Sequence, residues 1–116
     1  MKRCAAKLLL GLMLAAAAPA AGNKPLPWEK PRLQLGEDLY REHCSVCHDV
    51  EGKKSKRPGP SLYHLFKNEK LPLSGGKPSR EYVVVKVKFG GSFMPPFVKK
   101  MNDAEINALV DYLETK

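Results

Sequence analysis

Residues 44–48 read Cys-Ser-Val-Cys-His, and the rest of the chain has to be interpreted around this pentapeptide. Cys44 and Cys47 are three positions apart, a spacing at which both thiols can add to the two vinyl groups of one haem. His48 follows at once and would be held beneath the iron as an axial ligand. The pattern therefore predicts one covalently bound haem c, attached through Cys44 and Cys47 and ligated by His48.

Two other sites use a C-x-x-C pair, a thioredoxin-like redox centre and a zinc site. The redox centre would follow a strand, whereas Leu39, Tyr40 and His43 recur at helical spacing and predict a helix over residues 36–47. A closed zinc site needs four ligands, and beyond the motif only His43 and His64 remain, in no usual spacing. Haem attachment is the stronger interpretation.

The first twenty residues resemble a secretory signal. A positively charged start is followed by an apolar run over residues 8–18 and by small residues that end at Ala20. The prediction is a signal peptide over 1–20, a Pro-rich lead-in over 21–34 and one domain over 35–116. The protein is expected in the bacterial periplasm, with membrane attachment only if the signal stays uncleaved. Cys4 would leave with the signal, so Cys44 and Cys47 cannot belong to a larger disulfide framework.

Removal of residues 1–20 leaves 17 basic and 12 acidic residues, a net charge of +5. This balance favours redox protein partners with acidic docking surfaces. No basic stripe with interleaved aromatic residues is present, which argues against nucleic acid as a partner. The basic residues that could surround an exposed haem edge and dock a partner are Lys53, Lys54, Lys56, Arg57, Lys77, Lys99 and Lys100.

A second iron ligand is suggested by residues 90–97, which read Gly-Gly-Ser-Phe-Met-Pro-Pro-Phe. Glycines allow a close approach of the backbone, and prolines restrict the chain after the ligand. Met94 is therefore the candidate for the sixth iron position. Met101 and His64 are the competitors, although Met101 lacks the rigid flanking residues.

Two further segments have helical or strand patterns. Asn102 and Glu105 form a capping box at the start of an amphipathic helix that continues to Leu113. The valine-rich residues 81–89 favour a strand by propensity, although Tyr82, Val85 and Phe89 also form a helical stripe.

From residue 35 to 113 the chain resembles a class I c-type cytochrome. Gly36, Tyr40 and Cys44 keep that family's spacing on the N-terminal helix, and Leu109 with Tyr112 resemble their partners on the C-terminal helix. The resemblance implies an all-α domain of about four helices around one covalently bound haem, with residues 79–89 helical. It also implies that the Pro60 carbonyl accepts a hydrogen bond from the His48 imidazole and that Met94 ligates the iron.

The expected function is that of a single-electron carrier, because an iron with both axial positions filled has no site for substrate chemistry. Neither enzymatic activity nor a small-molecule substrate is expected. If Met94 is not the ligand, a gas sensor or a weak peroxidase is the alternative, and a haem subunit of a larger oxidoreductase complex stays open. The residues expected to line the haem pocket are Pro60, Leu62, Tyr82, Val85, Phe89, Phe93, Pro95 and Phe97.

Overall fold

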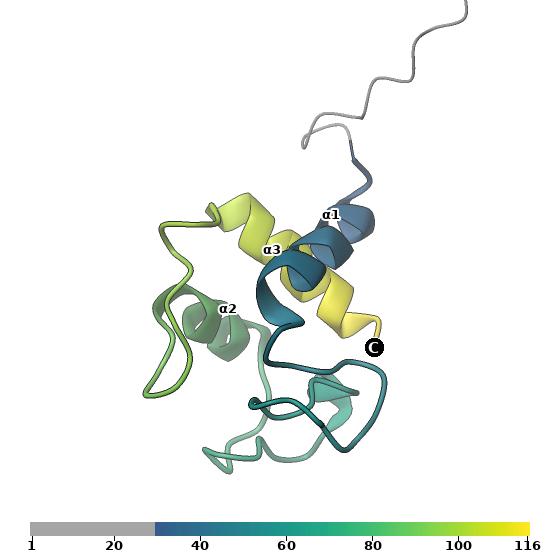
Figure 1. The fold of residues 1–116 in the computed structure, drawn as a ribbon, viewed down its shortest axis with the longest axis vertical. Coiled ribbons are helices and arrows are strands. Elements are labelled where there is room, and N and C mark those ends of the chain that lie inside the picture. The colour runs from purple at the N-terminus through teal and green to yellow at the C-terminus, as the bar shows by residue number, and fades with distance from the viewer. Residues whose placement is uncertain (1–29) are drawn as a thin grey trace, which may run out of the picture.

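The computed structural model describes residues 30–116, so the predicted signal segment and most of the Pro-rich lead-in lie outside the described residues. The described chain forms three α-helices: α1 (Arg32–Leu39), α2 (Arg80–Phe89) and α3 (Asp103–Glu114) (Figure 1). Two short helical turns, Tyr40–Cys44 and Leu65–Lys67, complete the set, and no strand occurs between residues 30 and 116. The all-α prediction is confirmed. None of the helices in this range is long and apolar enough to cross a membrane.

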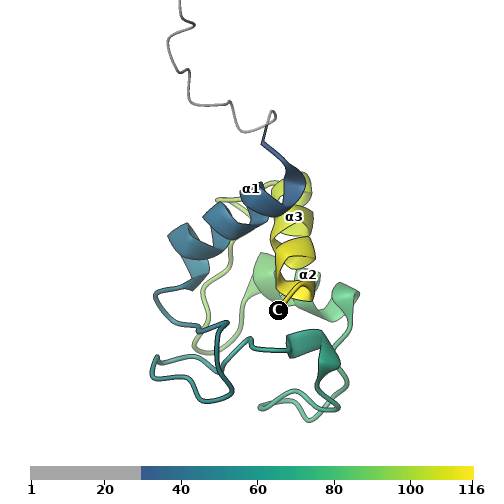
Figure 2. The same cartoon turned by 90° about the vertical axis from the view of Figure 1, so that its right-hand side faces the viewer.

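Helices α1 and α3 cross and pack against each other, as Figures 1 and 2 show. The crossing point is Gly36, where an added Cβ atom would lie 2.1 Å from the Ala108 carbonyl oxygen. One turn later the Tyr40 and Tyr112 rings meet with their centroids 5.7 Å apart. The glycine and aromatic positions that carried the family resemblance are thus the positions at which the two helices meet.

Helix α3 begins at its predicted cap. The Asn102 side chain accepts a hydrogen bond from the Glu105 backbone N–H at 2.9 Å, and the Glu105 carboxylate accepts one from the Asn102 backbone N–H at 2.8 Å. Ile106, Leu109 and Val110 are almost fully buried. At about 1.5–3 kcal/mol for each large apolar side chain, this face of α3 contributes much of the hydrophobic stabilisation.

Residues 80–89 form a helix, as the family resemblance implies, and not the strand that propensity favours. The Ser79 hydroxyl caps the helix by accepting a hydrogen bond from the Tyr82 backbone N–H at 3.1 Å. Gly90 ends the helix with φ of 67°, a conformation that glycine adopts without strain. Val83 and Val87, one turn apart, are the buried residues of α2.

The N-terminal helix starts earlier than predicted and changes its hydrogen bonding before the cysteines. α1 begins at Arg32, directly after Pro31, because a proline is compatible with a helix start but not with a helix interior. Residues 32–34 are exposed, so the sequence has no apolar stripe from which this first turn could be predicted. Tyr40–Cys44 then forms a π-helical turn, a feature that often occurs at functional sites.

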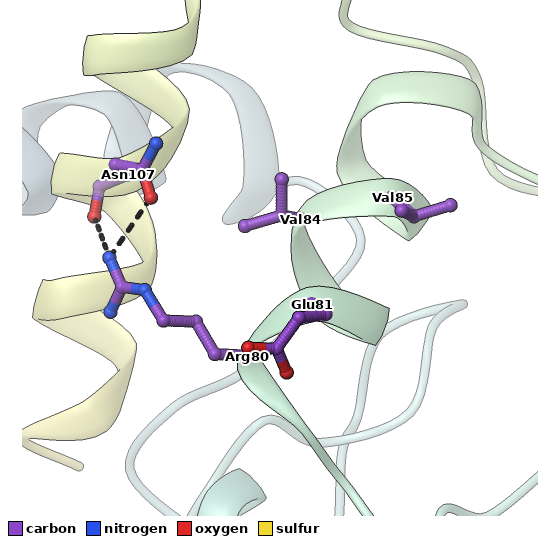
Figure 3. A pocket seen from close by; sticks show the side chains of 5 residues that line it. All are labelled: Arg80, Glu81, Val84, Val85 and Asn107. Atoms are coloured by element: carbon purple, nitrogen blue, oxygen red, sulfur yellow. Dashed lines mark hydrogen bonds between the residues drawn. The ribbon is translucent and has the colours of Figure 1, made fainter.

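Arg80 joins α2 to α3. Its guanidinium forms ion pairs with Asp111 at 2.7 Å and Glu114 at 3.0 Å. Figure 3 shows the same side chain reaching across to α3, where it donates hydrogen bonds to the Asn107 carbonyl oxygen and Oδ1. These contacts fix the start of α2 on the α1–α3 pair.

Candidate haem site

The imidazole of His48 is held on one side by the turn at residues 58–60. Its Nδ1 lies 2.8 Å from the Pro60 carbonyl oxygen. A carbonyl can only accept, so Nδ1 carries the proton and Nε2 is left as the nitrogen that can bind a metal. Gly59 lies against the ring, since a Cβ there would be 2.6 Å from His48 Cε1. The tautomer and the orientation of the ring are therefore set before any ligand binds.

A second hydrogen bond fixes the backbone of the same residue. The Tyr40 hydroxyl donates to the His48 carbonyl oxygen at 2.7 Å. Tyr40 is also the residue whose ring packs on Tyr112, so it links the helix crossing to the C-x-x-C-H motif. The sequence pattern explained the ring of Tyr40 but not its hydroxyl, because an aromatic position alone does not require one.

Cys44 is the last residue of the π-helical turn, and Cys47 follows three residues later in the next turn. The backbone N–H groups of Cys47 and His48 both donate to the Cys44 carbonyl oxygen, at 3.0 and 2.9 Å. Cys44 is buried and Cys47 is partly exposed, and the two thiols do not form a disulfide. Burial raises the pKa of the Cys44 thiol to about 12, so this thiol stays protonated at neutral pH.

The loop that contains Met94 folds back on the end of α2. The Gly91 backbone N–H donates to the Met94 carbonyl oxygen at 2.9 Å, and a Cβ on Gly90 would lie 2.2 Å from that same oxygen. Gly90 is therefore required by both its φ and its surroundings. The Met94 side chain is partly buried and packs on the hydrophobic core. Met101, the competitor, is itself a core residue with 2% of its surface exposed.

One continuous apolar cluster adjoins the motif. It contains Cys44, Val83, Val87 and Phe97, with Leu62 and Met94 packed against it. Pro60 contacts the motif itself, through His48. Of the residues predicted to line the pocket, the structure thus brings Pro60, Leu62 and Phe97 together with the motif.

For the other residues predicted to line the haem pocket, the assignment stays a prediction. Tyr82, Val85, Phe89, Phe93 and Pro95 are exposed and are not part of the cluster. A helix turns by about 100° per residue, which places positions 82, 85 and 89 on the side of α2 opposite to 83 and 87. The α2 side chains that share a cluster with Cys44 are therefore Val83 and Val87. The sequence could not identify them, because the valines make both sides of α2 apolar.

The predicted docking residues lie in two separate segments of the chain. Lys53, Lys54, Lys56 and Arg57 lie in the loop after the motif, at the lower end of the domain in Figures 1 and 2. Lys99 and Lys100 lie in the segment before α3, at the upper end in both views.

The first group is tied to Asp49. This carboxylate pairs with Arg57 at 2.7 Å and accepts hydrogen bonds from the Lys56 backbone N–H at 3.0 Å and from Ser55 Oγ at 3.1 Å. Desolvation acts to raise the pKa of Asp49, but these hydrogen bonds and the Arg57 charge outweigh it and keep the pKa below its usual range.

These residues fit a covalently bound haem. Two thiols lie on one turn, the neighbouring imidazole presents its Nε2, and a thioether lies in a glycine-bounded loop against the same apolar cluster. Within residues 30–116 no three His, Cys, Asp or Glu side chains are arranged to bind a metal ion by themselves. A surface hollow of about 260 Å³ between α2 and α3 is lined by Arg80, Glu81, Val84, Val85 and Asn107 and includes none of the motif residues (Figure 3).

Comparison with known proteins agrees with this geometry. Residues 31–113 match the family described as cytochrome c oxidase, cbb3-type, subunit III. The chain is 35% identical over 108 residues to a dihydro-heme d1 dehydrogenase of Pseudomonas aeruginosa. This alignment covers 91% of this chain but only 18% of that protein. It is 30% identical over 81 residues to a cytochrome c6 of Bryopsis maxima, and this alignment covers 70% of this chain and 88% of that protein.

The chain thus spans nearly the whole length of a small cytochrome and about a fifth of a much larger dehydrogenase. The matched range includes all three α-helices except the last residue of α3. With its C-x-x-C-H turn, its fixed imidazole and its helix crossing, the chain belongs to the class I c-type cytochromes, which carry covalently bound haem c.

Proposed function

We propose that this protein is a periplasmic one-electron carrier whose haem c has His48 and Met94 as its axial ligands. The observation that carries the proposal is that Met94 packs on the same apolar cluster as Cys44, while the adjoining His48 ring is fixed through Nδ1. The Nε2 atom of His48 and the thioether of Met94 are thus both available next to the turn that carries the two cysteines. With both positions filled, no site is left for a substrate.

When bound, haem c supplies an iron that gains and loses one electron, and a Met ligand raises its reduction potential. The polypeptide holds the two proposed iron ligands in fixed positions while the electron is exchanged. Pro60 and Tyr40 hold His48 at its ring and its backbone, and the Gly90–Gly91 turn holds the Met94 backbone. Val83, Val87 and Phe97 keep water away from the same region. Ligands that do not move between oxidation states favour rapid electron exchange.

A second candidate function is that of a haem subunit or relay within a larger oxidoreductase. The observation that favours it is the Pseudomonas relative, in which a segment like this chain makes up 18% of a protein named as a dehydrogenase. In both cases this chain passes single electrons. The predicted signal over residues 1–20 supports export, and acidic redox proteins are the partners that its net positive charge would favour.

The test is to replace Met94 and, separately, Met101 in the haem-loaded protein. Met94→Ala should remove the ferric sulfur-to-iron charge-transfer band, lower the reduction potential and allow carbon monoxide to bind the reduced protein. Met101→Leu is the matched control, because it conserves volume in the core, and it should leave all three unchanged. If Met94→Ala keeps the native band and potential while a Met101 or His64 variant loses them, the ligand assignment is wrong.

A further inference from the structure

Two stretches of the chain are joined at the C-x-x-C-H motif by backbone hydrogen bonds. The Gly59 backbone N–H donates to the Cys47 carbonyl oxygen at 2.7 Å. The Leu62 backbone N–H donates to the Asp49 carbonyl oxygen, also at 2.7 Å. These two bonds close the base of the loop over residues 50–58, so whatever holds that loop also holds the stretch that returns to the motif.

The hydrogen bond of the His48 ring lies between these two backbone bonds. His48 Nδ1 is 2.8 Å from the Pro60 carbonyl oxygen. An imidazole that donates a hydrogen bond through Nδ1 becomes a more basic metal ligand through Nε2. Because a hydrogen bond weakens as its length and angle depart from the preferred values, the basicity of this imidazole depends on where the loop holds the Pro60 carbonyl.

The Asp49 carboxylate braces this loop from inside. Its Oδ2 accepts hydrogen bonds from the Lys56 backbone N–H at 3.0 Å and from Ser55 Oγ at 3.1 Å. Its Oδ1 pairs with Arg57 Nε at 2.7 Å, and the Arg57 backbone N–H donates to Ser55 Oγ at 3.1 Å. The two carboxylate oxygens thus hold three consecutive residues, which lead directly into the turn at residues 58–60.

A second carboxylate of the same loop, that of Glu51, is directed to another part of the chain. It pairs with Lys116, beyond the end of α3, at 2.9 Å. The Glu51 side chain is 78% exposed, whereas that of Asp49 is 26% exposed. An exposed ion pair of this kind contributes little to holding a loop in place. The loop therefore has two side chains of equal charge, and it is Asp49 that contacts residues 55–57.

We propose that Asp49 is a positioning residue for the haem iron, which acts through the Pro60 carbonyl on the His48 imidazole. The proposal rests on the carrier function proposed above, with His48 as an axial ligand. By holding residues 55–57, the carboxylate keeps the Pro60 carbonyl within hydrogen-bond distance of Nδ1. This bond makes the imidazole a stronger electron donor, which favours ferric iron and lowers the reduction potential. Asp49 thereby sets part of the potential at which the electron is exchanged.

Loss of the carboxylate charge by itself would also raise the reduction potential, so charge and position have to be separated. Asp49 and Arg57 carry opposite charges, and electrostatics alone predicts opposite shifts of the potential when each charge is removed. Positioning predicts a rise in both cases, because Asp49→Asn and Arg57→Gln each remove a contact that braces the loop. Comparison of these two variants therefore separates the two explanations.

The test uses the haem-loaded, full-length protein and two measurements. A spectroelectrochemical titration gives the reduction potential, and NMR of the reduced protein gives the rate at which the His48 Nδ1 proton exchanges with solvent. Asp49→Asn and Arg57→Gln should both raise the potential and speed this exchange about tenfold or more, because the bond opens more often in a loosened loop. Asp49→Glu should recover part of both values. The matched control is Glu51→Gln, which removes the same charge from the same loop and should change neither.

Three results would overturn the positioning proposal. One is a His48 Nδ1 exchange rate in Asp49→Asn that equals that of the unmutated protein. Another is opposite shifts of the potential in Asp49→Asn and Arg57→Gln, since the two residues would then act by charge alone. The third is a Glu51→Gln variant that shifts both readouts as Asp49→Asn does. Failure of the carrier function is seen separately, as an unmutated protein that binds carbon monoxide when reduced.

Discussion

At the scale of single residues, the site depends on positions where no larger side chain fits and on residues whose contacts hold the motif in place. Gly59 leaves room for the His48 ring, and Pro60 sets the tautomer of that ring. Tyr40 connects the motif to the helix crossing through its hydroxyl and its ring. These contacts are short-range, and each can be tested by one substitution.

Gly36→Ala should destabilise the protein by about 2 kcal/mol or more, because the new Cβ would lie 2.1 Å from a backbone oxygen that cannot move away alone. Helix propensity by itself would stabilise the variant by about 1 kcal/mol, so the sign of the change separates packing from propensity. Urea unfolding of the haem-loaded protein measures it. Gly52→Ala is the control, since nothing lies within 4 Å of a Cβ there, and its unfolding free energy should hardly change. A stabilised Gly36→Ala variant would mean that the helices do not cross at this residue.

Asp49→Asn should lower stability at neutral pH and leave it unchanged in acid. The folded pKa of Asp49 is held below its ordinary value, so its contribution is present above about pH 4 and is lost as pH falls through the folded pKa. Thermal unfolding from pH 2 to pH 7 would show the two proteins converging at the acid end. A constant difference across that range would show that the carboxylate charge is not what stabilises the loop.

At the scale of elements, α2 shows how packing decides between two local preferences. A valine is at most about 0.7 kcal/mol worse than alanine in a helix, so the four valines cost no more than about 3 kcal/mol. Burial of Val83 and Val87 contributes about 1.5–3 kcal/mol each and outweighs that cost. Propensity alone could not predict the helix, and it could not choose between the two apolar sides. The family resemblance predicted the helix, and only the fold revealed that Val83 and Val87 are its buried residues.

The capping box of α3, in contrast, was predictable from two residues. Asn102→Ala removes the acceptor for the Glu105 backbone N–H and should cost about 1 kcal/mol. Asn68→Ala is a suitable control, because Asn68 is exposed and its side chain forms no hydrogen bond within residues 30–116. The difference between the two variants in chemical unfolding measures the cap. Equal stability of the two would show that α3 is held by its buried face alone.

At the scale of the whole molecule, the motif and the residues of the helix crossing could be identified from the sequence because each has a fixed spacing, and the all-α class followed from the family resemblance that they carry. The distribution of surface groups could not be identified in this way. The loop after the motif and the segment before α3, which carry the predicted docking lysines, lie at different ends of the domain in Figures 1 and 2, and sequence order alone does not show this. Phe89 and Phe93 are exposed, and their predicted place in the haem pocket stays a prediction.

We propose that this chain fills both axial positions of the iron, so that the protein carries electrons and performs no ligand chemistry. The most direct measurement is the absorption spectrum of the reduced, unmutated, haem-loaded protein before and after exposure to carbon monoxide. We expect an unchanged spectrum, because His48 and Met94 as axial ligands would leave no position for the gas. A spectrum that shifts rapidly and fully to a carbon monoxide adduct would contradict the account and favour a sensor or a peroxidase.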